Sequence, residues 1–190
     1  LEMQIFINRL LAFIAIFVLS PVFIIAAIGI FLSDPGPIFY ISKRAGYFGK
    51  PFYLLKFRSM RIVGVGSKIT STNDARIFRF GKFIRLTKID ELPQLFNVLI
   101  GQMVIVGPRP EDVGIVENHY SILLKESLRV LPGLASPGSL YNYTHLENNI
   151  IHDNAEVYYL ENIMPIKVAL DVVYARNKSL ICDLKIIMRT

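Results

Sequence analysis

The chain has 190 residues, of which 53% are hydrophobic, and its formal net charge at pH 7 is +6. This length allows one domain of ordinary size together with a membrane element, and the hydrophobic share is high for a soluble domain. The positive charge indicates a polyanionic partner such as anionic lipid, nucleic acid or a phosphorylated ligand. Cys182 is the only cysteine, which excludes an intrachain disulfide and fits a reducing compartment.

The first predicted element is a membrane helix within residues 3–33, because Leu10 to Ser33 contains no charged residue. About 20 apolar residues are enough to cross the hydrocarbon core as a helix. Arg9 precedes this run, and a strongly basic region begins at Lys43. The positive-inside rule therefore predicts that the body of the chain, residues 34–190, lies in the cytoplasm.

Ser20-Pro21, near the middle of the run, predicts a break in the helix. Proline lacks a backbone donor and clashes with the preceding turn, and the Ser20 hydroxyl can offer the freed backbone a partner. Two topologies are open: a kinked helix that spans the membrane, and a re-entrant helix with both ends in the cytoplasm. The residues alone favour the spanning helix, which is the commoner use of such a run.

The predicted body of the chain begins after the breaker Asp34-Pro35-Gly36-Pro37. Short strands are predicted at Ile38 to Tyr40 and at Pro51 to Lys56, and a Gly-, Ser- and Thr-rich loop is predicted at residues 63–73. Helical patterns follow at residues 76–86, 90–100, 110–128, 155–176 and 179–188, and Pro and Gly break the segments 107–110 and 131–143. We therefore predict an α+β fold, mostly helical, in which short strands and amphipathic interfacial helices accompany the membrane helix.

Positive charge is concentrated between Lys43 and Lys88, where twelve Lys or Arg residues accompany one acid, Asp74, for a net charge of +11. Four of these cations recur every three residues along a predicted helix: Arg76, Arg79, Lys82 and Arg85. One interpretation is a solvated face against anionic lipid headgroups. The other is a set of contacts to a mono- or diphosphate. The first interpretation does not explain why the basic run ends at two adjacent carboxylates.

Those carboxylates are Asp90 and Glu91. Pro93 is tolerated only in the first turn of a helix, which predicts Asp90 at or near the N-cap and Glu91 in the first turn. Capping alone explains acids in such places. A carboxylate that backbone amides keep ionised can also act as a nucleophile towards phosphorus or bind Mg²⁺. Phosphoryl transfer needs neutralisation of negative charge, which Arg85 and Arg109 can supply.

Taken together, these stretches resemble the bacterial sugar transferases, the monotopic phosphoglycosyl transferases. The Asp-Glu-Leu-Pro-Gln run followed by Gly-Pro-Arg-Pro is highly specific, and the matching residues cover nearly the whole chain. In the family's order they are Ser20-Pro21, Lys56-Phe57-Arg58-Ser59-Met60, Arg85, Asp90-Glu91-Leu92-Pro93-Gln94-Leu95-Phe96-Asn97-Val98-Leu99, Gly107-Pro108-Arg109-Pro110, Pro132-Gly133 and Asp183-Leu184-Lys185.

The resemblance implies transfer of a sugar 1-phosphate from a UDP-sugar to polyprenyl phosphate, with release of UMP and a requirement for Mg²⁺. It implies that Asp90 is the covalent nucleophile and Glu91 its assistant, and that Asp90, with or without Glu91, binds the Mg²⁺. Phosphate or substrate contacts are expected from the cations of the matching stretches, Lys56, Arg58, Arg85 and Arg109.

The resemblance also implies a re-entrant helix broken at Ser20-Pro21, which reverses the preference for a spanning helix. The expected location is the bacterial inner (cytoplasmic) membrane, with the catalytic domain facing the cytoplasm. Anionic lipid headgroups are then expected as a partner, and nucleic acid is not. Two rival functions stay open: a non-enzymatic, membrane-anchored basic module that binds anionic lipid or nucleic acid, and a membrane enzyme that hydrolyses phosphate esters.

Three stretches depart from the family's usual pattern. Gly101-Gln102-Met103-Val104 lacks an acid that the family commonly has there, and Leu131 stands where an Arg often precedes Pro-Gly. Ala135-Ser136-Pro137-Gly138 replaces the usual Thr-Gly continuation. The carboxylate pair is intact, but sugar and nucleotide contacts in the 131–145 region are not transferred from the family.

Overall fold

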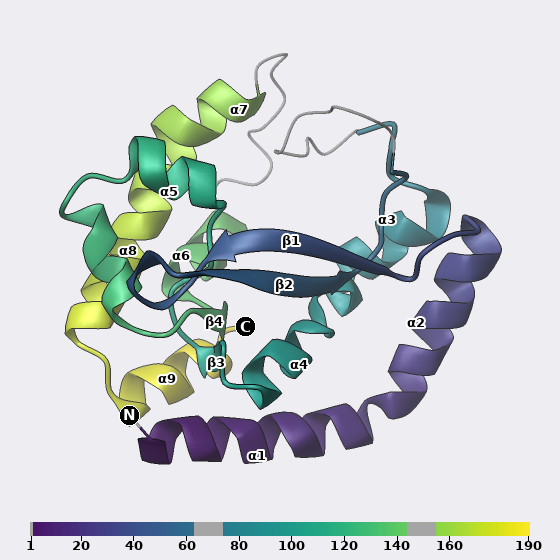
Figure 1. The fold of residues 1–190 in the computed structure, drawn as a ribbon, viewed down its shortest axis with the longest axis horizontal. Helices are drawn as coiled ribbons and strands as arrows, with labels where there is room; N and C mark the ends of the chain where they lie inside the picture. The colour runs from purple at the N-terminus through teal and green to yellow at the C-terminus, as the bar shows by residue number, and fades with distance from the viewer. Residues whose placement is uncertain (1, 63–73, 144–154) are drawn as a thin grey trace. The chain divides into compact units, whose positions relative to one another are not determined.

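The computed structural model describes residues 2–62, 74–143 and 155–190, so the predicted loop at 63–73 lies outside the described residues. The described residues are mostly helical and contain two small two-stranded sheets, which confirms the α+β class (Figure 1). They form two compact units. The first unit comprises residues 2–42, 53–62 and 74–101, and the second comprises residues 43–52, 102–143 and 155–190.

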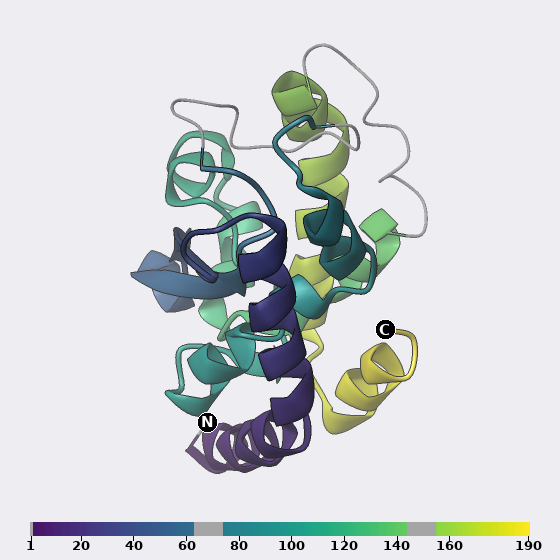
Figure 2. The same cartoon turned by 90° about the vertical axis from the view of Figure 1, so that its right-hand side faces the viewer.

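The first unit begins with two apolar helices, α1 (Glu2–Val18) and α2 (Ser20–Ser33). They are bent by 61° where they meet, and Figure 2 shows α2 turning away from α1. Pro21 lies in the first turn of α2, and the Ser20 hydroxyl donates to the Phe17 carbonyl at 2.8 Å. The predicted break at Ser20-Pro21 and the predicted role of the hydroxyl are therefore confirmed.

The length and composition of these helices bear on the membrane prediction. Within the described ranges, no single helix is long and apolar enough to cross a membrane, whereas α1 and α2 together reach the length and composition of a broken span. Large apolar side chains remain exposed along both helices, among them Phe13, Phe17 and Leu32.

The core of the first unit lies between α2 and α3 (Arg79–Leu86). A Cβ at Gly29 would lie 2.3 Å from the ring of Phe80, so glycine is what allows this ring to reach α2. Helix α3 begins three residues later than predicted, because Phe78 has extended backbone. Arg76 therefore precedes the helix, where its side chain pairs with Asp74 (2.6 Å).

The hairpin β1 (Phe39–Ala45) and β2 (Pro51–Phe57) confirms both predicted strands, and β1 extends beyond the predicted Tyr40. The connecting turn needs left-handed backbone at Gly49, where φ is +75°, and glycine adopts this without strain. Residues 53–57 of β2 belong to the first unit.

The single helix predicted at 90–100 is interrupted. A 3₁₀ turn at Ile89–Glu91 is followed by α4 (Gln94–Leu99), which begins after Pro93. The end at Gly101 is as predicted, because this glycine has a φ of +86°. Helix α4 packs against α1, and the Arg9 guanidinium donates to the Ile100 carbonyl at 3.0 Å.

The second unit contains two strands that the sequence did not predict, β3 (Val104–Val106) and β4 (Gly133–Ala135). They are parallel, with Val104 opposite Gly133 and Val106 opposite Ala135. After β3 the loop folds back towards the start of β4, since the Gly133 amide donates to the Pro108 carbonyl at 2.8 Å. A Cβ on Gly133 would lie 2.0 Å from the Gly107 nitrogen, so only glycine allows this approach.

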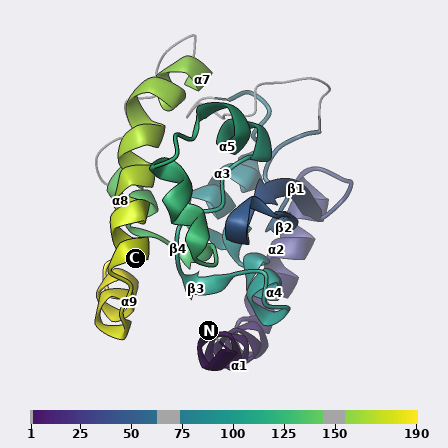
Figure 3. The ribbon, with the colours of Figure 1, turned by 60° about the vertical axis from the view of Figure 1, so that its left-hand side comes forward.

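The helix predicted at 110–128 is wrong as a single element. Helix α5 (Val113–His119) ends at the extended backbone of Tyr120, and a separate 3₁₀ helix covers Leu124–Arg129. The described residues also contain α6 (Pro137–Tyr141), α7 (Ala155–Tyr158), α8 (Met164–Arg176) and α9 (Leu180–Ile187), the last three of which are labelled in Figure 3. The predicted C-terminal helical pair is thus confirmed, with a π-helical turn at Tyr159–Ile163 between α7 and α8.

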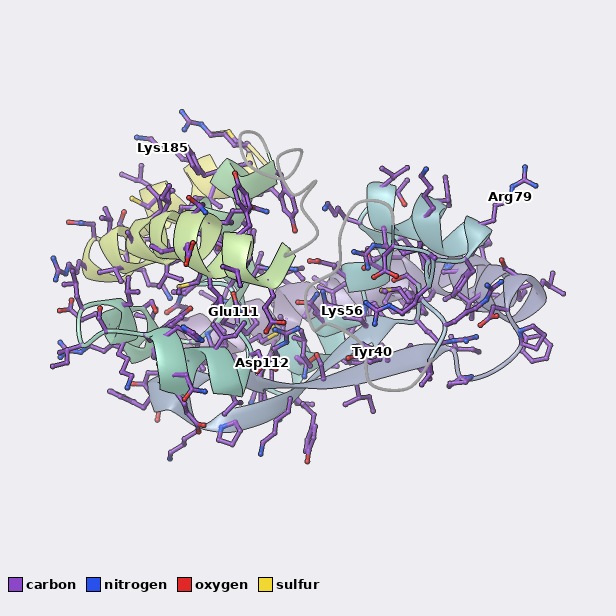
Figure 4. All side chains as sticks on the ribbon, turned by 90° about the horizontal axis from the view of Figure 1, so that it is seen from above. Tyr40, Lys56, Arg79, Glu111, Asp112 and Lys185 are labelled. Atoms are coloured by element: carbon purple, nitrogen blue, oxygen red, sulfur yellow. The ribbon has the colours of Figure 1, made fainter. Side chains whose placement is uncertain are left out.

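A buried ionic network joins α8 to the segment before α5. The Lys167 ammonium donates to Glu111 at 2.9 Å and to the Tyr159 hydroxyl at 2.6 Å, and that hydroxyl donates to the same carboxylate. Figure 4 labels Glu111 next to Asp112, the residue that caps α5. Burial by itself would raise the pKa of Glu111, but the charge of Lys167, the hydrogen bond from Tyr159 and the charge of Arg44 together outweigh it and hold this pKa at about 2.

We predict that Lys167→Met destabilises the protein by about 3–5 kcal/mol, because it leaves Glu111 buried without its cation. Since the pKa of Glu111 is 4.5 when unperturbed and about 2 in the fold, the carboxylate stabilises the fold above about pH 4.5, and this stabilisation is lost as the pH falls towards 2. Urea unfolding in detergent at pH 7 measures the loss. The double variant Glu111→Gln/Lys167→Met should recover part of it, and equal stabilities of wild type and Lys167→Met would contradict the role of the pair.

Candidate active site

The predicted nucleophile Asp90 lies at the centre of the 3₁₀ turn between α3 and α4. Lys88, just before this turn, has left-handed backbone with a φ of 56°, which is uncommon for a residue with a side chain. Such conformations cost free energy and are retained where the surrounding structure requires them. Here the conformation reverses the chain after α3 and begins the turn that carries Asp90 and Glu91.

The predicted N-cap role of Asp90 is wrong. No side chain caps α4, and the Asp90 carboxyl is 8% exposed, with its Oδ1 atom lacking any hydrogen-bond partner among the described residues. Burial raises the pKa of Asp90 above its usual value, and the nearby charge of Glu91 raises it further. Backbone amides therefore do not keep this carboxylate ionised, contrary to the argument from capping.

Nearby cations favour the ionised form instead, although burial prevails. The charge of Lys56 opposes the rise in the pKa of Asp90 most strongly, followed by the charges of Arg85 and Lys88. Lys56 projects from β2, where Figure 4 labels it, and its ammonium lies 3.3 Å from Glu91 Oε1. The first unit thus brings four of the residues predicted for the site or its basic run near Asp90, the predicted nucleophile: Glu91, Lys56, Arg85 and Lys88.

Asn97 fixes α4 to β2 and so fixes the turn that precedes α4. Its Oδ1 atom accepts from the Leu55 amide at 3.0 Å, and its Nδ2 donates to the Tyr53 carbonyl at 2.7 Å. A buried amide that replaces a strand partner in this way holds the helix at a defined position along the strand. The site is therefore supported by regular structure, which positions a reacting group more precisely than a loop does.

Arg58 needs a correction, because its guanidinium is committed elsewhere. This side chain is 4% exposed and donates to the Pro37 carbonyl at 2.6 Å and to both the carbonyl and the carboxylate of Asp34. It also lies over the ring of Phe78. All three of its nitrogens hold the turn between α2 and β1, so we remove Arg58 from the set of phosphate contacts.

Arg109 belongs to the second unit, in the Gly-Pro-Arg-Pro loop after β3. Its backbone amide donates to Asp171 Oδ2 at 3.0 Å, and the Gly138 amide donates to Asp171 Oδ1 at 2.9 Å. Asp171 is buried in α8, and burial raises its pKa to about 6 against the lowering effect of these two amides. A carboxylate on a rigid helix therefore sets the backbone position of Arg109.

The donor set around Asp90 fits Mg²⁺ in its chemistry. This cation takes oxygen ligands and is commonly held by one or two carboxylates together with substrate phosphates. Asp90 Oδ1 is a buried oxygen without a partner, and Glu91 follows directly in the same turn. No cluster of three or more His, Cys, Asp or Glu residues suited to a metal occurs within residues 2–62, 74–143 and 155–190. Substrate oxygens or water would have to complete the coordination.

Four residues were not among those predicted for the site: the positioning residues Asn97, Asp34 and Asp171, and the buried Gln94. Gln94 and Asn97 lie inside the specific run of residues that begins with Asp90. Gln94 follows Asp90 by four residues and precedes Asn97 by three, and this spacing is the available signal. Asp171 gave no signal, because a lone acid in an apolar helical pattern is usually solvent-facing.

Comparison with known proteins now identifies the family. A sequence model described as bacterial sugar transferase matches residues 2–190. The chain belongs to this family. UDP-glucose:undecaprenyl-phosphate glucose-1-phosphate transferase of Xanthomonas campestris pv. campestris is 36% identical over 189 residues, which are 96% of this chain and 37% of that protein.

Two further relatives show the range of this family. UDP-N-acetylgalactosamine-undecaprenyl-phosphate N-acetylgalactosaminephosphotransferase of Aeromonas hydrophila is 35% identical over 95% of the chain and 41% of its own length. Exopolysaccharide production protein PSS of Rhizobium leguminosarum bv. phaseoli is 33% identical over 93% of the chain and 86% of its own length. The sugar transferase chain thus spans well under half of the first two relatives and most of the third.

We predict that Asp90→Asn raises the unfolding temperature at pH 7. The fold raises the pKa of Asp90, so the ionised carboxyl destabilises the native state at every pH above the ordinary pKa of 3.8, and the neutral amide removes this cost. The gain should shrink as the pH falls towards 3.8, where the wild-type carboxyl is protonated. Thermal unfolding at pH 4 and pH 7 provides the comparison, and a lower unfolding temperature of the variant at pH 7 would show that the carboxylate is a structural partner.

Proposed function

We propose that this chain transfers a sugar 1-phosphate from a UDP-sugar to undecaprenyl or another polyprenyl phosphate and releases UMP. The observation that carries the proposal is a buried carboxyl, Asp90, with an unpartnered oxygen and with Lys56, Arg85 and Lys88 acting on it. The names of relatives support the two substrates, since they specify UDP-sugars and undecaprenyl phosphate. A structural cap would not need burial or cations.

In the first proposed step, an Asp90 carboxylate oxygen attacks the β-phosphorus of the UDP-sugar. A bond forms between that oxygen and the phosphorus, and the bond from the phosphorus to the oxygen bridging the α-phosphate breaks. UMP leaves with the electron pair, and a sugar-phosphoryl aspartate remains. Lys56 and Arg85 offset the negative charge of the diphosphate, and Glu91 holds the Lys56 ammonium next to the nucleophile.

In the second proposed step, an oxygen of polyprenyl phosphate attacks the same phosphorus. The bond between phosphorus and Asp90 breaks, the carboxylate leaves with the electron pair, and the products are a polyprenyl-diphosphate sugar and the regenerated enzyme. Asp90 and Glu91 would hold Mg²⁺, which neutralises diphosphate charge when bound. Arg109, whose backbone Asp171 fixes, is proposed as a phosphate contact.

The membrane part of the proposal rests on the bent helix pair. We place α1 and α2 in the bacterial inner (cytoplasmic) membrane as a re-entrant element, with the remaining residues in the cytoplasm among anionic headgroups. The 61° bend, the Ser20 hydroxyl bond and the exposed apolar side chains support this arrangement. The acceptor is a lipid, so an enzyme of this kind needs its nucleophile close to the membrane.

We predict that the wild-type protein releases UMP from UDP-glucose or UDP-N-acetylgalactosamine when polyprenyl phosphate and Mg²⁺ are present, and that Asp90→Asn lowers the rate by more than about 10³-fold. Because the fold raises the pKa of Asp90, activity should fall with decreasing pH at values above the ordinary Asp range. The assay measures UMP and labelled sugar in the lipid fraction.

The matched control for this assay is Glu117→Gln, which removes an exposed carboxylate on α5 and should retain full activity. Full activity in Asp90→Asn would exclude the nucleophile assignment. Accumulation of water-soluble sugar phosphate without labelled lipid would identify a hydrolase. Salt-sensitive lipid or nucleic-acid binding, without turnover and indifferent to Asp90, would identify a non-enzymatic basic module.

We predict that a cysteine at Asn8, in a Cys182→Ser background, reacts with a membrane-impermeant maleimide only when the reagent has access to the cytoplasmic side. The re-entrant helix keeps this end of α1 in the cytoplasm. Pro21→Ala should favour a straight helix, because it restores the missing backbone donor, and should shift part of the labelling to the opposite side. Labelling of the Pro21-containing protein from the periplasmic side alone would establish a spanning helix.

A further inference from the structure

Gln94 is a buried residue to which the proposed mechanism gives no role. Its side chain is 0% exposed, and neither its Oε1 nor its Nε2 atom has a hydrogen-bond partner among the described residues. A buried carboxamide without partners costs stability, and native proteins keep few such groups. Where one is kept, a ligand that completes its hydrogen bonds is a physical reason for it.

Gln94 lies close in sequence to Asp90, the proposed nucleophile. Gln94 follows Asp90 by four residues, and the backbone between them is right-handed helical, with φ and ψ of −54° and −36° at Leu92 and −61° and −15° at Pro93. The 3₁₀ turn that carries Asp90 therefore leads directly into the first residue of α4, which is Gln94. Asp90 Oδ1 also lacks a partner, so two incomplete polar groups lie within four residues of each other on one short segment.

A second side-chain amide on this segment, that of Asn97, differs from Gln94 because it is fully bonded. Asn97 is also buried, but both of its polar atoms pair with the backbone of β2. The segment can therefore satisfy an amide internally where the amide has a structural role. The unsatisfied state of Gln94 is specific to the end of the helix that is closest in sequence to Asp90.

The charge around Asp90 selects the class of ligand. Lys56, Arg85 and Lys88 all act on this carboxyl, which makes the surroundings favourable for an anion with several oxygens. The two N–H groups of a carboxamide are donors, and a phosphoryl oxygen is an acceptor without protons. We propose that Gln94 is a substrate-binding residue whose Nε2 donates to an oxygen of the phosphoryl group that reacts at Asp90.

This inference rests on the proposed function and adds a residue to it. The Gln94 donor complements the cations, because a neutral amide fixes the orientation of the phosphoryl group while Lys56 and Arg85 supply charge. A hydrogen bond to a charged oxygen that strengthens as the phosphorus is attacked would accelerate the reaction as well as bind the substrate. Gln94 is then a specific partner of the transferred group and has no need of a partner within the chain.

The test compares Gln94→Met with Asn97→Leu in the full chain. Methionine has nearly the volume of glutamine and needs no hydrogen bonds, so we expect Gln94→Met to unfold at the same or a higher temperature than the wild type, while UMP release (kcat/KM) falls about 10- to 100-fold. Asn97→Leu should unfold at a lower temperature, because it removes partners from Leu55 and Tyr53. A lower unfolding temperature for Gln94→Met would overturn the inference by showing a structural role.

Gln94→Glu separates a donor from an acceptor at nearly constant shape. A carboxylate repels phosphoryl oxygens, so this variant should lose more activity than Gln94→Met. Equal or greater activity than the wild type would overturn the inference, because the carboxamide would then be acting through Oε1.

A binding measurement distinguishes failure of this inference from failure of the proposed function. Magnesium with inorganic diphosphate should raise the unfolding temperature of the wild type, and the rise should be smaller in Gln94→Met. If the wild type shows no UMP release but this difference is present, the proposed reaction fails and the phosphoryl contact stands. If Asp90→Asn abolishes UMP release while Gln94→Met keeps both wild-type activity and the full rise, the contact fails and the reaction stands.

Discussion

The burial of the Asp90 carboxyl is the constraint on which the first unit depends. A carboxylate out of water favours its protonated form, yet the role of nucleophile that we propose for Asp90 requires the ionised form. Cations on separate elements, Lys56 from β2 and Arg85 from α3, oppose the effect of burial on this carboxyl. The basic run is therefore not a uniform solvated face. Some of its members oppose the effect of burial on one group, and others, such as Arg58, hold turns.

The same constraint explains why the turn is fixed so firmly. A misplaced cation would leave a buried charge uncompensated, so the distance between β2 and the turn matters. Asn97 ties α4 to the backbone of β2, and Pro93 begins α4 with a residue that needs no amide partner. The left-handed backbone at Lys88 ends α3 abruptly and directs the chain into the turn. The left-handed backbone at Lys88, the start of α4 at Pro93 and the bonds from Asn97 to β2 thus all help to fix the 3₁₀ turn.

The sequence predicted what depends on local pattern: the hairpin strands, the break at Ser20-Pro21 and the C-terminal helices. The site at Asp90 and Glu91 stays a prediction, and its motif is what the sequence offered for it. The predictions from the sequence were wrong or incomplete where contacts between residues far apart in the chain determine the structure. Strands β3 and β4 are three residues each, too short for periodicity to register, and they pair across about 30 residues of chain through Gly107 and Gly133. The role of Arg58 was missed for the same reason, because its partner Asp34 is 24 residues away. The capping argument used sound local physics but could not anticipate burial, which changed the direction of the pKa shift of Asp90.

Asp171 has a consequence for how members of this family can diverge. One buried carboxylate accepts both the Arg109 amide and the Gly138 amide, and a Cβ at Gly138 would lie 2.2 Å from the Lys167 carbonyl. Asp171 therefore links three segments that must be inherited together: the loop after β3, the start of α6 and the middle of α8. A chimera that exchanges the segment after β4 would need to retain glycine at position 138 or import α8 with it. Asp171 itself must also be kept, because its carboxylate makes the bonds to the two backbone amides of this joint.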